Sequence, residues 1–287
     1  MNDDVVFEAE RRRLAAIGYR MLGSTADADD VVQETWLRWH RLGEDGRAEL
    51  DRPGAWLTTV ATRIALDRLK SAQRQREEYV GPWLPEPVIT DDDPAESVEL
   101  AESLTLGFLT VLERLGPVER AVFLLSDVFE EPFAAIAPTV GRSEETCRQI
   151  ASRARRRIRE ERKRFEPTDG DALLHAFVQA CMVGTLDEFR KVLADDVVMV
   201  SDGGSEVHAA RRPVLGIERV ARLLGNLTRR MPDDTALELH RVNHEPGLLV
   251  RRGGRPWSVL ALEAHDGRVT AVRLVLNPDK LQRVADL

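Results

Sequence analysis

The sequence predicts two all-α helical domains followed by an α+β domain, and three observations carry this prediction. Apolar residues recur at helical spacing through residues 14–69 and again through residues 104–158. A span with four prolines, residues 79–94, separates these two stretches. Beyond residue 170 the pattern changes to strand-like apolar runs joined by glycine turns. With 287 residues, the chain is long enough for several domains at the usual ~100–200 residues per domain.

The composition is that of a globular protein and excludes a disordered chain. Hydrophobic residues make up 43% and charged residues 31% of the sequence. No apolar run approaches the ~18–20 residues that cross a bilayer, and the acidic N-terminus has no apolar signal region. We therefore expect a cytoplasmic protein with no membrane partner. Cys147 and Cys181 have no metal-ligand spacing and are predicted to be reduced thiols.

Residues 1–78 are predicted to form the first helical domain. Gly23 ends its first helix, and Ser24 with Asp27 predicts the cap of the second. Pro53 suits the first turn of a third helix, whose far side carries several arginines. The apolar stripe of the second helix is predicted to consist of Val32, Trp36 and Trp39.

Residues 79–95 form a proline-rich linker that is too apolar to be an idle tether. Four closely spaced prolines exclude a helix interior or a central strand. The segment WLPEPV, from Trp83 to Val88, is predicted to be extended and to dock its apolar side chains on a folded surface. The alternative is a semi-rigid polyproline spacer.

Residues 96–166 are predicted to form the second helical domain, which ends in a helix-turn-helix. A short apolar helix is followed by a turn at Gly141 and a second helix that begins at Ser143. Residues 142–164 carry nine arginines and one lysine against four glutamates, although the whole chain has a net charge of −8. Such a basic helix suits phosphate and base contacts in DNA. The alternative is a solvated helix face with Glu–Arg pairs.

Residues 170–287 are predicted to form the α+β domain. A helical stripe comes first and strand-like runs follow at residues 197–200, 248–252, 257–262 and 268–276. Gly253-Gly254 and Asp266-Gly267 lie between the last three runs and are typical of hairpin turns. This order favours an antiparallel meander in a separate domain.

No catalytic constellation is evident, so we expect no enzyme, no metal and no cofactor. The sequence has no Walker loop, no dinucleotide-binding glycine motif and no nucleophile elbow. His240 and His244 are four residues apart in an expected strand, where this spacing need not converge on a metal. The turn from Asp202 to Ser205 is either a phosphate-binding nest or, more simply, a plain turn.

Several segments together resemble the extracytoplasmic-function sigma factors. Residues 27–41 (DADDVVQETWLRWHR) are similar to sigma regions 2.1–2.2, and residues 52–70 to regions 2.3–2.4. Residues 112–159 resemble region 4. WLPEPV, DGGS (202–205) and NPDKL (277–281) resemble the signature of the subgroup with a fused SnoaL-like C-terminal domain. The resemblance implies a cone-shaped NTF2-like fold for that domain and regulation by it.

The resemblance also implies partners, namely promoter DNA and core RNA polymerase through its β′ and β subunits, and it leaves open an unknown small-molecule ligand of the C-terminal domain. The region 4 residues expected at the −35 element are Ser143, Glu144, Thr146, Arg148, Gln149, Ser152, Arg153, Arg155 and Arg156. The region 2 residues expected at the −10 element are Trp56, Thr58, Thr59, Arg63 and Arg68. The residues expected to bind core polymerase are Asp27, Asp30, Gln33, Glu34 and Arg38.

A further set of residues is expected to regulate these two domains by contact between the linker and the C-terminal domain. The regulatory residues are Trp83, Leu84, Pro85, Asp202, Gly203, Gly204, Asn277, Pro278, Asp279 and Lys280. Two other functions stay open from the residues alone. One is a SnoaL-type enzyme or ligand-sensing domain fused to a DNA-binding module. The other is a transcription factor that binds duplex DNA without polymerase.

Overall fold

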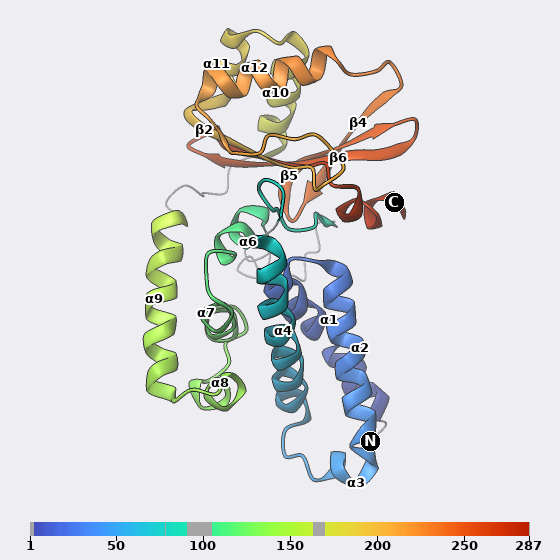
Figure 1. Cartoon of the computed structure of the whole chain (residues 1–287), viewed down its shortest axis with the longest axis vertical. Coiled ribbons are helices and arrows are strands. Elements are labelled where there is room, and N and C mark those ends of the chain that lie inside the picture. Colours follow the sequence, from blue (N-terminus) through green and yellow to red (C-terminus); the bar gives the residue numbers. More distant parts are fainter. Residues whose placement is uncertain (1–2, 78, 91–104, 163–169, 287) are drawn as a thin grey trace. The chain divides into compact units, whose positions relative to one another are not determined.

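The computed structural model describes residues 3–77, 79–90, 105–162 and 170–286, which divide into two units (Figure 1). The first unit takes in residues 1–78 and 111–160, and the second takes in 79–110 and 161–287. The predicted boundaries differ from this grouping, because the linker and the start of the next helix fold with the C-terminal domain. The rest of the predicted linker, residues 91–95, and the expected helix start at residue 96 lie outside the described residues. Among the described residues, no helix is both long and apolar enough to cross a membrane.

The N-terminal part of the first unit is a set of helices that pack through apolar stripes. These helices are α1 (Asp3–Leu22), α2 (Thr25–Arg41), α3 (Gly43–Ala48) and α4 (Pro53–Glu77). The predicted cap of α2 is confirmed, since the Ser24 side chain accepts a hydrogen bond from the Asp27 backbone N–H at 3.2 Å. The stripe prediction is wrong at Trp36, which is exposed and stacks on His40. Thr35 lies at the centre of the buried face of α2. Trp36 is about 100° further around the helix, and this rotation turns its side chain away from the buried face toward solvent.

The C-terminal part of the first unit contains the predicted helix-turn-helix. Its elements are α7 (Pro117–Phe123), the π-helical turn η1 (Leu124–Val128), α8 (Phe133–Val140) and α9 (Glu144–Arg162). Gly141 ends α8 with φ at 67°, a left-handed conformation that glycine adopts without strain. The Ser143 hydroxyl then accepts a hydrogen bond from the Thr146 N–H at 3.2 Å, so the predicted start of α9 is confirmed.

The second unit is built on a seven-stranded sheet with the order β1-β4-β5-β6-β7-β2-β3. The strands are β1 (Ile89–Thr90), β2 (Leu193–Asp202), β3 (Val214–Leu215), β4 (Thr235–Val242), β5 (Glu245–Arg252), β6 (Arg255–His265) and β7 (Arg268–Val275). Strands β5 to β7 form the predicted antiparallel meander, β4 extends it on one side, and β2 joins β7 in parallel. The predicted hairpin turns are confirmed, since both residues of Gly253-Gly254 and of Asp266-Gly267 have positive φ.

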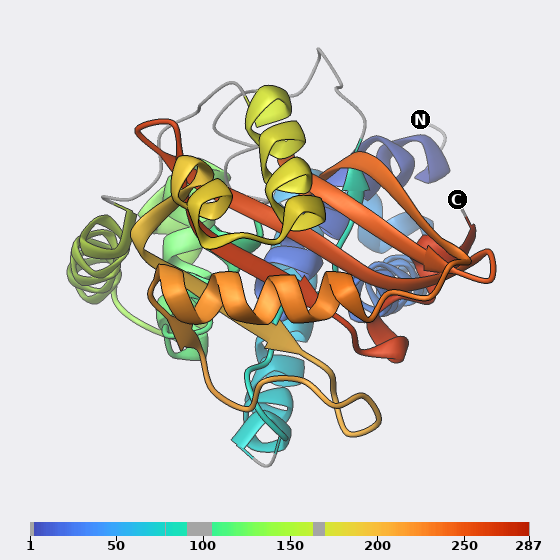
Figure 2. The ribbon, with the colours of Figure 1, turned by 90° about the horizontal axis from the view of Figure 1, so that it is seen from above.

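The sheet is covered on both faces, by different parts of the chain. Helices α10 (Gly170–Val183), α11 (Leu186–Val192) and α12 (Ile217–Arg229) lie over one face (Figure 2). Buried residues on the other face come from the linker, from the first turn of α6 (Leu106–Leu112) and from the chain's last turns, η2 (Pro278–Lys280) and η3 (Arg283–Asp286). Linker residues 79–90 are thus part of a core of the second unit.

Candidate functional site

The carboxylate of Asp202, at the end of β2, joins three segments that are far apart in the sequence. Its Oδ1 accepts hydrogen bonds from the Tyr79 hydroxyl at 2.6 Å and from the Gly204 N–H at 3.0 Å. Its Oδ2 accepts from the Leu84 N–H at 2.8 Å and from Lys280 Nζ at 2.7 Å. Asp202 is 1% exposed. A buried carboxylate with four donors is fully satisfied, so it holds the linker, its own loop and the C-terminal turn together.

Lys280 and Asn277 extend this network from the C-terminal turn to the linker. Lys280 Nζ also donates to the Leu84 carbonyl and lies 4.1 Å from the centre of the Trp83 ring, a cation–π distance. Asn277 donates from Nδ2 to the Tyr79 hydroxyl at 2.9 Å and caps the turn that contains Pro278 and Asp279. Burial, followed by the hydrogen bond to Asp202, raises the pKa of Tyr79, so this phenol stays a donor.

The apolar half of the linker is inserted beneath the sheet. Leu84 is fully buried among the apolar residues of β5, β6 and β7, and Pro85 is buried beside it. The linker then forms β1, which pairs with β4 and is itself the edge strand of the sheet. The Val88 N–H donates a hydrogen bond to the side-chain oxygen of Asn243 at 2.9 Å, and the Asn243 N–H donates to the Val88 carbonyl at 2.7 Å. The linker therefore has the predicted extended and docked conformation.

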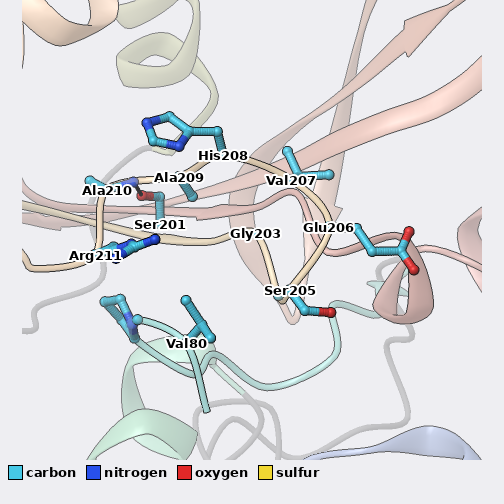
Figure 3. Close-up of a pocket in the computed structure, with 13 residues that line it drawn as sticks. Val80, Ser201, Gly203, Ser205, Glu206, Val207, His208, Ala209, Ala210 and Arg211 are labelled. Atoms are coloured by element: carbon cyan, nitrogen blue, oxygen red, sulfur yellow. Dashed lines mark hydrogen bonds between the residues drawn. The ribbon is translucent and has the colours of Figure 1, made fainter.

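The loop after Asp202 forms a cavity of about 170 Å³ with the start of the linker (Figure 3). Val80 faces the loop that runs from Gly203 to Arg211, with Ser205 and Glu206 at its turn. A Cβ at Gly203 would lie 2.1 Å from the Val207 carbonyl oxygen, so this position needs glycine. Gly204 has φ at 63° and sits against Asn277, which explains the second glycine.

A second anchor, which the sequence did not indicate, lies at the first turn of α6. Glu245, at the start of β5, accepts a hydrogen bond from the Leu106 N–H at 3.0 Å. Arg273 of β7 is ion-paired with Glu263 of β6, and all three charged side chains are buried. Burial raises the pKa of Glu245 to about 7, against the opposite effects of Arg273 and of the helix N–H groups. These residues lie on three different strands, so no local sequence pattern predicts that they come together.

In the first unit, the expected −35 residues line the outer face of α9. Its inner face is a buried stripe of Cys147, Ile150, Ala151, Ala154 and Ile158. Arg148 pairs with Glu144 at 2.6 Å, and Arg155 pairs with Asp127 of η1. Arg153 and Arg156 are exposed and have no ion pair among the described residues. Gln149, Ser152, Arg153 and Arg156 are therefore exposed and, in the described part of the chain, not held by an ion pair.

The expected −10 residues of α4 are not all accessible. Thr58 is 5% exposed, and Trp56 packs with its ring centre 5.8 Å from that of Trp39. Thr59 lies 3.3 Å from the hydroxyl of Thr139, and Arg63 donates to the Pro138 carbonyl at 2.8 Å. The expectation fails for Thr58 in this arrangement, because α4 has buried neighbours on more than one face.

Arg68 lies with the expected polymerase-binding residues instead of the other −10 residues. Its guanidinium is 2.8 Å from Asp30, 3.7 Å from Asp27 and 3.9 Å from Glu34. Glu34 also pairs with Arg38 at 2.5 Å, and Gln33 is exposed beside them. This surface of α2 and α4 is thus a connected patch of mixed charge.

Comparisons with known proteins cover both units. The family described as Sigma-70 region 2 matches residues 6–75, and Sigma-70, region 4 matches residues 106–158. The ECF RNA polymerase sigma factor SigJ of Mycobacterium tuberculosis is 37% identical over 96% of this chain and 91% of its own length. A probable ECF sigma factor of the same species, SigI, is 34% identical over 96% of this chain and 93% of its own length. The crystal structure of SigJ superimposes with a TM-score of 0.78 at 35% identity, covering 96% of this chain and 97% of that chain.

Proposed function

The chain belongs to the extracytoplasmic-function family of RNA polymerase sigma factors, and we propose that its C-terminal domain controls its activity by holding the linker. As a sigma factor, it directs core RNA polymerase to promoter DNA. In the proposal, α2 binds the β′ and β subunits of core polymerase, α4 contacts the −10 element and α9 contacts the −35 element. Relatives that match nearly the whole chain are sigma factors, so an enzyme or a polymerase-independent operator-binding protein is not favoured.

The observation that carries the regulatory proposal is the Asp202 carboxylate with its four donors. It fixes Tyr79 and Leu84 at one end of the connection between the two helical domains. Glu245 fixes Leu106 at the other end. Fully extended, residues 79–105 could span about 90 Å at ~3.3 Å per residue. Docking on one domain removes most of that reach, so the docked and released linkers are two states with different promoter-binding geometry.

Contacts within the first unit support the same two-state mechanism. Thr59 and Arg63, two of the proposed −10 contacts, are engaged with α8 of the helix-turn-helix. The same side chains cannot bind DNA and α8 at once. Promoter binding in this proposal therefore requires α4 and α8 to separate, which a docked linker would oppose.

A mobility-shift comparison with and without core polymerase tests the function, and truncation tests its regulation. The full chain should bind a cognate promoter tightly with core enzyme and weakly alone; tight binding by the chain alone would favour the operator-binding alternative. Removing residues 277–287 deletes Lys280 and should change promoter activity, and removing everything after residue 168 should change it again in the opposite sense. If Trp83→Ala and the short truncation both leave transcription and linker proteolysis unchanged, the C-terminal domain is not a regulator.

The proposed −35 contacts predict two kinds of defect. Arg153→Ala should cost about 1–3 kcal/mol of promoter affinity and relax specificity at one base pair, as expected for loss of a bidentate base contact. Arg156→Ala, which removes a proposed phosphate contact, should weaken all promoters alike. Arg157→Ala is the matched control, because Arg157 already binds the Arg114 carbonyl and Glu119. Unchanged transcription in both Arg148→Ala and Arg153→Ala would show that α9 is not the reading helix.

The proposed polymerase-binding face predicts a charge-dependent loss of core affinity. Reversing Glu34 and Arg38 together keeps their ion pair but inverts the charges offered to the partner. We expect core binding to weaken about tenfold or more, because close interfacial charge pairs couple strongly. Reversing Glu8 and Arg11, an ion pair of similar exposure on α1, is the control. If the Glu34/Arg38 and Glu8/Arg11 variants bind core polymerase with equal affinity, then α2 does not provide the polymerase-binding face.

A further inference from the structure

A narrow apolar cleft opens between the helices and the sheet of the C-terminal domain, away from the linker. It lies among α10, α12, β5 and β6, and its lining side chains are almost all aliphatic or aromatic. About 80 Å³ of the cleft can be reached by the centre of a water molecule. Since one water needs roughly 10–15 Å³ on this measure, the space suits a slender chain of about six to eight carbons.

The rim of the cleft exposes large apolar side chains. Met182 is 61% exposed, Leu227 39% and Trp257 37%, and all three line the same opening. Isolated exposed apolar residues are common in proteins, but a group of them around an apolar opening marks a binding site. The hydrophobic part of a ligand would therefore contact apolar side chains both inside the cleft and at its rim.

One cation, Arg252, lines this apolar opening, and among the described residues no carboxylate forms an ion pair with it. The alternation of β5 puts Arg252 on the same face as Leu248 and Val250, and its guanidinium lies 3.9 Å above the centre of the Trp257 ring. Its Nε is buried and, among the described residues, has no hydrogen-bond acceptor. The hydroxyl of Thr235, paired with Arg252 across the β4–β5 ladder, is likewise buried without a described partner.

The neighbouring arginine shows what a satisfied cation looks like on this strand. Arg251 points to the opposite face and donates from Nε to both carboxylate oxygens of Glu238, at 3.0 and 3.1 Å. Asp234 lies close to Gly253 in the next turn, yet no ion pair joins it to Arg252 among the described residues. A desolvated donor without an acceptor is costly, and an anionic ligand would remove that cost.

We propose that this cleft binds an apolar carboxylic acid, with its carboxylate on Arg252 and its hydrocarbon part between α10, α12 and the sheet. The proposal does not depend on the regulatory role of the linker. The thiol of the cleft, Cys181, has a pKa that burial raises to about 12, so it does not supply a thiolate nucleophile at neutral pH.

Calorimetric titration of the full chain with octanoate, octan-1-ol and octylamine tests the proposal. The three probes share one hydrocarbon chain and differ in the charge of the head group. Octanoate should bind at one site, at least about tenfold more tightly than octan-1-ol, because a charge-assisted hydrogen bond adds to the same apolar burial. Octylamine should bind more weakly still, since its charge repels Arg252.

Two matched variants locate the binding. Arg252→Gln should reduce octanoate affinity to that of octan-1-ol, whereas Arg251→Gln, on the opposite face of β5, should bind octanoate like the unmodified chain. Thermal unfolding of each variant checks that the domain is folded. Equal affinity for all three probes, no saturable binding of octanoate, or an unchanged octanoate affinity in Arg252→Gln would each overturn the proposal. So would a dimer of the free chain that buries Met182 and Trp257, because a second copy would then be the occupant of the rim.

Discussion

Replacing Asp202 with alanine is expected to release the linker and to destabilise the C-terminal domain by about 3–5 kcal/mol, the usual cost of breaking a buried ion pair. The variant leaves the Leu84 N–H, the Tyr79 hydroxyl and the ammonium of Lys280 without the acceptor that now satisfies them. Limited proteolysis should cut within residues 79–90 at least about a hundredfold faster, since each 1.4 kcal/mol is a factor of ten in the docking equilibrium. Asp195→Ala, an exposed position on the same strand, is the control.

A double-mutant cycle separates the ion pair from the rest of the Asp202 network. Lys280→Met alone leaves the carboxylate buried without its cation, so it should also be strongly destabilising. Asp202→Asn alone leaves the ammonium of Lys280 buried without its anion. In the double variant Asp202→Asn/Lys280→Met neither charge is buried alone, so its loss of stability should be clearly smaller than the sum of the losses of Asp202→Asn and Lys280→Met measured singly. Simple additivity would mean that the Asp202–Lys280 ion pair does not contribute to holding the C-terminal turn on the linker.

The parts of the fold that were predictable are those in which a local pattern has one physical solution. Gly253-Gly254 and Asp266-Gly267, each between apolar runs, specified the hairpins of β5, β6 and β7, because both turn residues need positive φ. Ser143 and Gly141 specified the helix-turn-helix for the same local reasons. The position of β2 was not predictable in this way. It pairs with β7 in parallel, and such pairing depends on residues about 75 positions apart.

In the candidate site too, only the features with a local sequence pattern were predictable. Trp83 and Leu84 were too apolar for a solvated linker, so docking was predictable, and Leu84 is indeed buried. Tyr79, Asn243 and the Glu245–Arg273–Glu263 cluster were missed, because a polar residue shows its partner in the sequence only when the two are local. The burial of Thr58 was unforeseen for a related reason. A polar residue in an amphipathic helix looks exposed until a second helix covers that face.

Glu245→Gln is expected to stabilise the C-terminal domain at pH 8 while changing little at pH 5. Glu245 is 8% exposed and shares its surroundings with Glu263, so two carboxylates lie near the single guanidinium of Arg273. Burial raises its pKa from 4.5 to about 7, although Arg273 and the N–H groups of Leu106 and Gly107 act in the other direction. Between pH 4.5 and about pH 7, Glu245 of the folded chain therefore holds a proton that Glu245 of the unfolded chain has released.

The sign of the pH dependence follows from that proton. Its contribution to stability is fully present below pH 4.5 and is lost as the pH rises through about 7. At 1.36 kcal/mol per pKa unit, the loss amounts to about 3 kcal/mol. Glutamine keeps an oxygen for the Leu106 N–H but carries no charge, so the variant should keep its stability where the unmodified chain becomes less stable. Hydrogen exchange of the β5 and β6 amides from pH 5 to 8 measures this in the full chain, with the exposed Glu206→Gln as control. Parallel pH profiles for the two variants would mean that Glu245 is already ionised at neutral pH and that the first turn of α6 is held by a charged carboxylate.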